Sequence, residues 1–248
     1  MGGVARRATV IREQQAQGGH LLVLDAGNSL VGDTDPAKKT QGQTSIAVMN
    51  LLGYDAIALG PQDLALGVEV LRERIAEAEF AVLSVNAVAS ADNEPIATPY
   101  VVLPMEGHRV ALVGLSGGPG TAEVRVLDPL QTARSVAAEL ASEADVIILL
   151  SQAGDAANQQ IAEGVPGVDL IVSGGTSQLA SPWQSAKTGT LILHADQSSP
   201  GHAGRNLGLA GLSFDAQGEL VEQTWKRVSL GTAIADDPEL SQWVQAQR

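Results

Sequence analysis

The sequence predicts an α/β sandwich with mixed sheets, and two patterns carry that prediction. Strand-like and helix-like segments alternate early in the chain, and strands pair as hairpins late in it. Four short runs, at residues 21–24, 56–59, 146–150 and 169–172, are almost continuously apolar. Such runs are typical of strands covered on both faces. We therefore expect these four runs to be buried neighbouring strands.

The first half of the chain supplies most of the alternating pattern. It begins with a helix over residues 4–17, which the Gly18-Gly19 pair ends. A polar loop is expected over residues 25–40. Further helices are expected at residues 44–52 and 67–79, and strands at residues 81–85, 100–103 and 110–113.

The second half repeats this alternation and then changes to a hairpin. Helices are expected at residues 128–142, 156–163 and 238–245, and a strand at residues 190–194. The segments 207–214 and 221–228 flank the turn Asp215-Ala216-Gln217-Gly218, which predicts a hairpin. No internal repeat or low-complexity linker interrupts the pattern, so we expect one domain over residues 1–248.

Composition narrows the classes of function. The 248 residues are 44% hydrophobic and 17% charged, a balance typical of a globular domain. The net charge of −13 disfavours nucleic-acid binding, because such a surface repels phosphate backbones. The chain has no cysteine, which excludes disulfides, thiolate zinc sites and a cysteine nucleophile. No apolar run approaches the roughly 18 residues that span a bilayer.

Four loops of small residues follow expected strands and form the default candidate site. Sites in open α/β sheets form where strands end at their carboxyl side. The loops are Asp25-Ala26-Gly27-Asn28-Ser29, Gly60-Pro61-Gln62-Asp63, Ser151-Gln152-Ala153-Gly154 and Ser173-Gly174-Gly175-Thr176-Ser177. They offer hydrogen-bonding groups and two carboxylates, Asp25 and Asp63, but no imidazole.

One segment matches the G-x-S-x-G pattern of a serine nucleophile. Residues 114–118 read Gly-Leu-Ser-Gly-Gly after an expected strand. A nucleophile elbow needs a helix directly behind it, whereas Pro119-Gly120 follows here. We therefore interpret residues 114–118 as a glycine-rich loop.

Four histidines are the remaining candidates for metal ligands. His20 and His108 fall in expected turns. His194, at the end of a strand, and His202, in the following loop, are spaced so that a metal pair is conceivable. Surface or loop histidines are commoner, and we favour that interpretation.

At the four loops the sequence resembles the calcineurin-like metallophosphoesterases, specifically the catalytic domain of 5′-nucleotidases and UDP-sugar hydrolases. Residues 2–7 resemble the family's G-G-x-A-R helix start, and residues 22–29 its L-L-x-D-A-G-D-S. Residues 49–67 resemble M-N-x-L-G-Y-D-A-x-x-L-G-N-H-E-F-D-x-G. Residues 144–154 resemble E-A-D-V-I-I-x-L-S-H-x-G, and residues 165–177 resemble V-P-G-I-D-x-I-I-x-G-H-T-H. This resemblance implies an αββα sandwich of two mixed sheets flanked by helices.

The departures from the family pattern fall on its chemistry. The resemblance implies two divalent metals that clamp a phosphate and generate a hydroxide nucleophile. The family's bridging aspartate is replaced by Asn28, and the asparagine and histidine of its G-N-H-E motif by Pro61 and Gln62. The histidine of S-H-x-G is replaced by Gln152, and those of G-H-T-H by Gly175 and Ser177.

A two-metal site needs anionic or imidazole ligands to offset the dehydration of the ions. We therefore expect no bound metal or other cofactor, no catalytic residue and no nucleotidase activity. The remnant pocket would comprise Asp25, Asn28, Gln62, Asp63, Gln152, Gly175 and Ser177. The favoured hypothesis is a degenerate, non-catalytic domain with a binding or structural role. The alternative is a phosphoester hydrolase with a rebuilt or residual site.

The resemblance also implies a first strand before the G-G-x-A-R helix, with an aspartate and a histidine ligand. Residues 1–248 contain no counterpart of it. Because an inner strand left unpaired would be costly, we expect upstream residues, a donated strand or a closed-up sheet, with a protein partner or oligomer. Family members are usually exported or membrane-associated. The sequence shows no signal peptide at Met1, and the compartment stays open.

Overall fold

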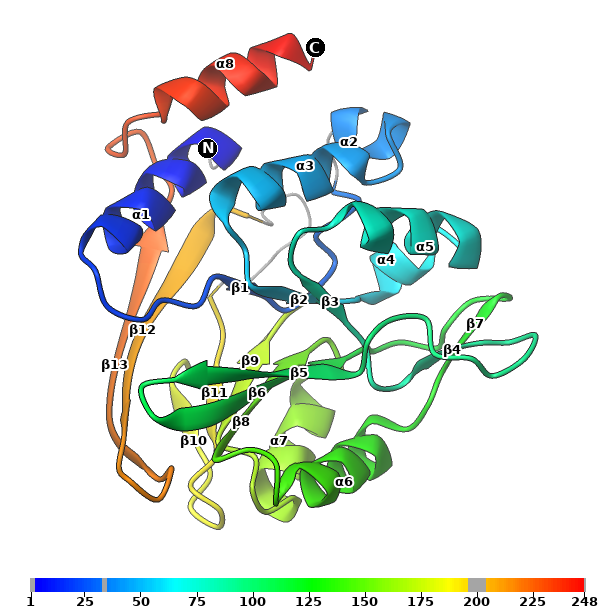
Figure 1. Ribbon diagram of the computed structural model, residues 1–248, viewed down its shortest axis with the longest axis vertical. Helices are drawn as coiled ribbons and strands as arrows, with labels where there is room; N and C mark the ends of the chain where they lie inside the picture. The colour runs from blue at the N-terminus through cyan, green and yellow to red at the C-terminus, as the bar shows by residue number, and fades with distance from the viewer. Residues whose placement is uncertain (1–2, 33–34, 196–203, 248) are drawn as a thin grey trace.

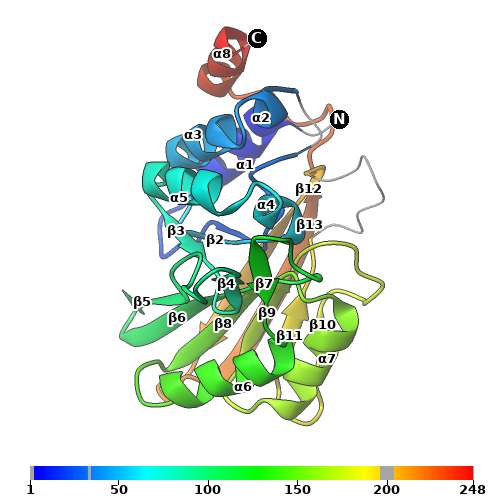
Figure 2. The same ribbon diagram turned by 90° about the vertical axis from the view of Figure 1, so that its right-hand side faces the viewer.

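The computed structural model describes residues 3–32, 35–195 and 204–247 and confirms the α/β sandwich. Helices lie above a small sheet, a larger sheet lies beneath it, and two more helices cover the lower face (Figures 1 and 2). The helices are α1 (Val4–Ala16), α2 (Asp35–Lys39), α3 (Gln43–Leu52), α4 (Pro61–Leu64), α5 (Val68–Glu77), α6 (Pro129–Leu140), α7 (Asp155–Gly164) and α8 (Pro238–Ala246).

The larger sheet is mixed. Its strands run in the order β10 (Trp183–Gln184), β11 (Leu191–Leu193), β9 (Leu170–Ser173), β8 (Val146–Ser151), β6 (His108–Leu115) and β5 (Tyr100–Met105). The four inner strands are parallel, and both edge strands are antiparallel to their neighbours. Strands β5 and β6, which pair antiparallel, contain the strands expected at residues 100–103 and 110–113.

The smaller sheet has three parallel strands among the described residues. Its order is β1 (Leu24–Asp25), β2 (Ala56–Ala58) and β3 (Ala81–Leu83). Two antiparallel ribbons accompany the sheets: β12 (Asn206–Phe214) with β13 (Leu220–Ser229), and β4 (Ala87–Ala89) with β7 (Val124–Val126). The β12–β13 ribbon confirms the hairpin expected around residues 215–218.

Three apolar layers hold the sandwich together. Between the two sheets, Ala58 and Leu83 of the smaller sheet share one cluster with Leu112 and Leu150 of the larger sheet. A second cluster joins the upper helices to the smaller sheet, and a third joins α6 and α7 to the larger sheet. Since Val, Leu, Ile and Ala make up most of these clusters, the low aromatic content is compatible with a full core.

The expectation of four neighbouring strands was wrong. The pairs β1–β2 and β8–β9 belong to different sheets. A continuous run of apolar residues indicates that both faces of a strand are covered, but it does not identify the strand that pairs with it. The run at residues 21–24 is also less buried than expected: strand pairing begins at Leu24, and Leu21 is 39% exposed.

Several short elements were absent from the sequence prediction. The polar stretch at residues 25–40 contains α2, and the loop Gly60-Pro61-Gln62-Asp63 contains the helical turn α4. The strands β4, β7 and β10 have two or three residues each, too few for a recognisable period.

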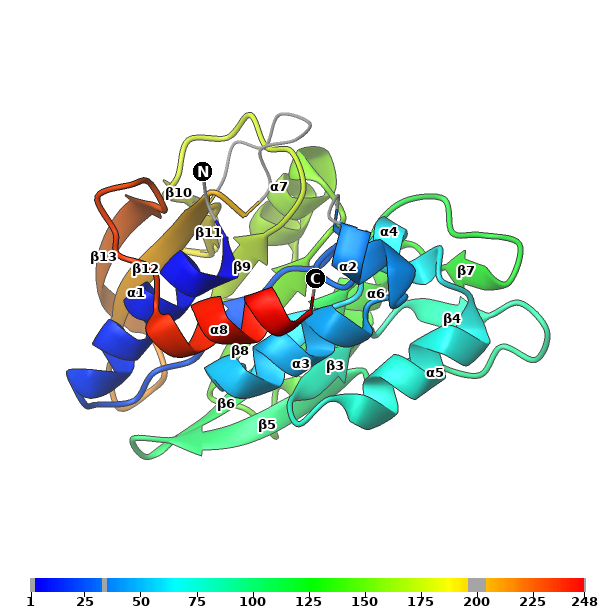
Figure 3. The same cartoon turned by 90° about the horizontal axis from the view of Figure 1, so that it is seen from above.

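The first and last helices of the described chain lie side by side over the upper layer (Figure 3). Arg12 of α1 forms ion pairs with Asp237 at 2.7 Å and Glu239 at 2.8 Å, at the start of α8. Leu240 and Trp243 of α8 belong to the same apolar cluster as Ala8 and Ile11 of α1. No helix within the described ranges is long and apolar enough to span a bilayer.

Candidate functional site

The candidate site lies where the carboxyl ends of strands from both sheets approach each other. The loops after β1 and β2 belong to the smaller sheet, and the loops after β8 and β9 belong to the larger sheet. The Asn28 amide donates to Gln152 Oε1 at 3.2 Å, which joins the two sets of loops. The structure therefore brings together the strand-end loops that the sequence singled out.

Asp63 organises the two loops of the smaller sheet. Its buried carboxylate accepts the backbone N–H of Asn28 at 2.8 Å, of Gly60 at 2.9 Å and of Leu30 at 3.0 Å. Burial raises the pKa of the Asp63 carboxyl to about 6, although the three backbone donors act in the opposite direction. With both oxygens engaged, Asp63 holds the loops in place rather than facing a ligand.

Asn28 and Gln152 form the centre of the site. Asn28 has φ of 59°, in the left-handed region that Asn and Asp tolerate better than most residues. Its Oδ1 accepts the backbone N–H of Gln62 at 2.8 Å, while its amide donates to Gln152. The side-chain oxygens of Asn28 and Gln152 thus both accept hydrogen bonds from within the site.

Gln152 is tightly enclosed by backbone that only glycine permits. A Cβ at Gly174 would collide with Gln152 Nε2, and one at Gly27 would lie 2.9 Å from Gln152 Cγ. The Gln152 side chain is buried, and within the described residues its Nε2 has no hydrogen-bond partner. The side chain therefore occupies the space between the loops.

Gly175 and Ser177 differ in their surroundings. Gly175 has φ of 74°, and a Cβ there would lie 3.3 Å from Gln152 Oε1. Ser177 Oγ instead donates to Asp155 Oδ1 at 2.7 Å, at the start of α7. Ser177 thus bonds to a residue that sequence reasoning overlooked, because Asp155 lies just beyond the Ser151-Gln152-Ala153-Gly154 loop.

Asp25 is half-buried and belongs to a polar group with Arg7 and Tyr54. It accepts the Gly27 N–H at 2.8 Å, and burial raises the pKa of its carboxyl. Arg7 of α1 lies near enough to oppose that shift, and Arg7 Nη1 donates to the Tyr54 hydroxyl at 3.3 Å. Arg7 directly follows residues 2–6, which match G-G-x-A-R, so that motif gave no signal for Arg7 itself.

The weaker sequence candidates have structural roles. Ser116 Oγ donates to Leu59 O at 2.7 Å, and a Cβ at Gly114 would collide with the backbone of Leu83. The G-x-S-x-G segment therefore joins the two sheets, and no helix follows it directly. His194 is buried rather than in a surface loop, with Nδ1 2.7 Å from Ser173 O. His202 lies outside the described residues.

Metal-ligating side chains are sparse in the described chain. Within residues 3–32, 35–195 and 204–247, no group of three or more His, Cys, Asp or Glu side chains is arranged to hold a metal ion. At the candidate site, Pro61 has no side-chain donor atom, and the amide oxygens of Asn28 and Gln152 already accept hydrogen bonds. This set of groups is a poor match for a pair of divalent cations.

Known proteins share this fold and this order of strand-end loops. The snake venom 5′-nucleotidase of Gloydius brevicauda is 30% identical over 268 aligned positions, covering 96% of the chain. The 5′-nucleotidase precursor of Thermus thermophilus superposes with a TM-score of 0.86 over 99% of the chain, at 27% identity. The calcineurin-like phosphoesterase YfkN of Bacillus subtilis has a TM-score of 0.79 over 99% of the chain, at 22% identity, which concerns the fold alone.

The fold is that of the calcineurin-like metallophosphoesterases. The proteins similar to it in sequence include 5′-nucleotidases, and the chain is a 5′-nucleotidase-like metallophosphoesterase domain. No protein-family model matches the chain. The chain spans 45% of the length of the Gloydius protein and 52% of the Thermus chain.

Proposed function

We propose that this 5′-nucleotidase-like domain is non-catalytic and serves a binding or structural role as part of a larger assembly. One observation carries the proposal. The positions that resemble the family's metal ligands hold Asn28, Pro61, Gln152, Gly175 and Ser177, and the position of its catalytic histidine holds Gln62. Asn28 donates to Gln152 and accepts the Gln62 N–H, so the side-chain oxygens of Asn28 and Gln152, the two amide oxygens that could bind a metal, already accept hydrogen bonds.

The energetics of the site support this proposal. Two divalent cations would displace the Asn28–Gln152 hydrogen bond and would gain only neutral oxygens in exchange. The dehydration of such ions is normally offset by carboxylates and imidazoles. The two nearby carboxylates are engaged elsewhere: Asp63 accepts three backbone N–H groups, and Asp25 accepts the Gly27 N–H.

The alternative, a hydrolase with a rebuilt site, has less support. It would need a nucleophile or a general base at the strand-end loops. Among the described residues there, Ser116 is buried and bonded to Leu59 O, and Ser177 donates to Asp155. His194 is the one buried imidazole near the loops in the described ranges, and its Nδ1 lies against Ser173 O.

Metal analysis and a phosphoesterase assay test the proposal together. The purified chain, incubated with manganese and zinc and then desalted, should retain no stoichiometric metal. It should hydrolyse neither p-nitrophenyl phosphate nor adenosine monophosphate above background. About two retained metals per chain, with hydrolysis that an Asn28→Ala substitution abolishes, would overturn the proposal.

A matched control shows that the assay can detect a metal at this position. The double variant Asn28→Asp with Gln152→His restores one carboxylate and one imidazole. It should retain more metal than the parent chain, because both groups are ligands that zinc and manganese accept.

A further inference from the structure

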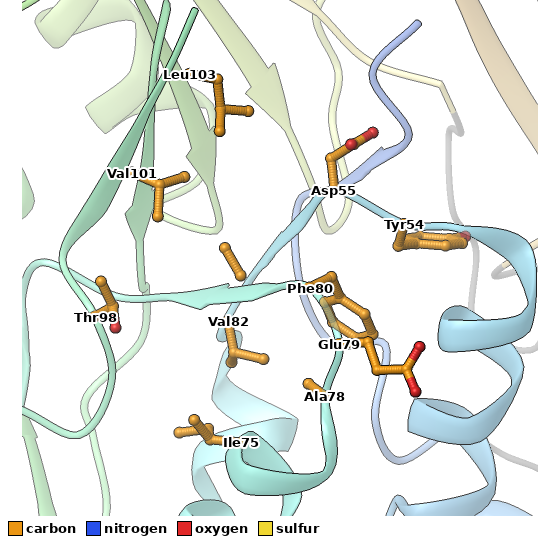
Figure 4. A pocket seen from close by; sticks show the side chains of 11 residues that line it. Tyr54, Asp55, Ile75, Ala78, Glu79, Phe80, Val82, Thr98, Val101 and Leu103 are labelled. Atoms are coloured by element: carbon orange, nitrogen blue, oxygen red, sulfur yellow. The ribbon is translucent and has the colours of Figure 1, made fainter.

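A groove of about 500 Å³ lies beside β3 and β5 (Figure 4). It includes Tyr54 and Asp55, just before β2, and Phe80 to Val82, at the start of β3. The candidate site lies beyond the carboxyl ends of the strands, whereas these residues lie at their amino ends. The groove is therefore separate from the loops that would have held metal.

One wall of the groove is a stretch of strand edge that is unpaired within the described residues. Strand β3 is the last strand of the smaller sheet, and within the described residues Ala81 and Val82 pair with β2, while Leu83 also bridges Thr98 on the other side. Ala81 N–H donates to Asp55 O at 3.0 Å, and Leu83 O accepts the Leu59 N–H at 3.0 Å, so both residues bond toward β2. Because backbone groups alternate along a strand, those of Phe80 and Val82 point the other way, toward the groove.

This free stretch is short and bounded. From the Val82 carbonyl onward the same edge is closed by a parallel bridge between Leu83 and Thr98, with Ser84 N–H donating to Thr98 O at 2.9 Å. At the other end, α5 comes before Phe80 in the chain. An added segment would therefore contact β3 over a few residues only.

The facing wall is apolar. Val101 and Leu103 of β5 are two residues apart, so both side chains project to the same face of the strand, into the groove. Ile75 of α5 and the Phe80 ring add to this lining. Side chains of an added strand that alternate toward Val101 and Leu103 would be apolar.

The charge of the groove is entirely negative. Its ionisable acids are Asp55 and Glu79, and none of its lining residues is lysine, arginine or histidine. Asp55 uses Oδ2 to accept the Val23 N–H at 2.7 Å. Burial raises the pKa of the Asp55 carboxyl, so a cation placed beside it would relieve an unfavourable charge.

We propose that the groove between β3 and β5 binds an extended segment of a protein partner, in which apolar residues alternate with basic ones. The segment adds to the edge at Phe80 and at the Val82 N–H, a known mode of peptide recognition. A second copy of this chain is a poor occupant, because its net charge is −13. The inference rests on the binding role in the proposed function and specifies the surface that would carry it.

A labelled, end-blocked peptide of about six alternating valine and lysine residues, near the usual strand length, is the probe. Fluorescence anisotropy with the full chain should give weak but saturable binding. Methylating those backbone nitrogens that face one edge of the peptide should abolish binding, whereas methylating those on the opposite edge should leave it intact. Equal effects of the two methylated peptides would contradict strand addition.

Charge gives the second arm of the test. The same peptide with glutamate in place of lysine should not bind. Glu79→Lys should weaken binding of the lysine peptide about five- to tenfold, while Glu222→Lys, an equal charge change on the exposed face of β13, should have little effect. Equal binding of the two peptides, equal effects of the two substitutions, or a stable homodimer would overturn the inference.

Failure of this inference can be distinguished from failure of the proposed function. Peptide binding does not involve the strand-end loops, and metal retention does not involve the groove. A metal-free chain that binds no peptide refutes the groove assignment alone. A chain that binds the peptide and also retains two metals refutes the non-catalytic proposal alone.

Discussion

At the scale of single residues, the centre of the candidate site is occupied by neutral amide side chains, where the resembled family has ionisable ligands. Sequence alone placed Asn28, Gln62 and Gln152 on strand-end loops that the structure brings together. It could not predict that Asn28 bonds to Gln152, because side-chain conformation across two sheets is not encoded in local pattern. Asp155, the partner of Ser177, was missed because it lies just beyond the loop that follows β8.

Asp169 offers a residue-scale prediction about pH. Burial raises the pKa of its carboxyl from 3.8 to about 6, with Glu219 acting in the same direction. Since the folded state holds the proton more tightly, this group's stabilising contribution is full below about pH 4. It is lost as the pH rises through about 6.

The substitution Asp169→Asn keeps an oxygen that can accept the Ile147 N–H. At pH values from 5 to 8, the free energy of unfolding of the variant should be about 1–3 kcal/mol higher than that of the parent chain. Urea unfolding at both pH values measures this difference. The same substitution at exposed Asp92 is the control, and equal pH dependence in the two variants would contradict the assignment.

At the scale of elements, long and strongly patterned segments were predictable. The helices α1, α3 and α6 lie within two residues of their expected bounds, because glycines or an Asp-Pro pair mark their ends. Helix α2 was missed because its sequence is polar, and β10 because it has two residues. Short elements such as these are defined by tertiary contacts.

Helix α8 gives the element-scale prediction. The Asp237 side chain accepts the Leu240 N–H at 2.9 Å as the N-cap and also pairs with Arg12 at 2.7 Å. Asp237→Ala should lower the free energy of unfolding by about 1–2 kcal/mol, mostly through the lost cap. Asp236→Ala, which removes an ion pair with Arg6 but no cap, should cost less than about 1 kcal/mol. Equal losses in thermal unfolding would show that the cap is unimportant.

At the scale of the whole molecule, the layered sandwich was predictable but the distribution of strands was not. Runs such as 56–59 and 146–150 have the same apolar character, yet they belong to different sheets. Their separation depends on the crossover helices and on close approach at Gly114, where a side chain would collide with Leu83. The assignment of strands to sheets depends on contacts between residues far apart in the chain, so it cannot be predicted from a short window of sequence.

The interface between the sheets should dominate stability. Leu150 of β8 is fully buried between them. Leu150→Ala should lower the free energy of unfolding by about 2–5 kcal/mol, because the packed sheets cannot close the cavity fully. Val221→Ala, on an exposed position of β13, should change it by less than about 0.5 kcal/mol. Denaturant unfolding compares the two, and similar values would mean that the sheets are loosely packed.

The contact between α1 and α8 has a consequence for biosynthesis. The apolar face of α1 around Ile11 is completed by Leu240, which the ribosome adds almost at the end of the described chain. At about 5–20 residues per second, that delay is on the order of ten seconds or more. Throughout this interval the nascent α1 keeps part of its apolar stripe uncovered, which makes it the segment that a ribosome-associated chaperone would be expected to hold.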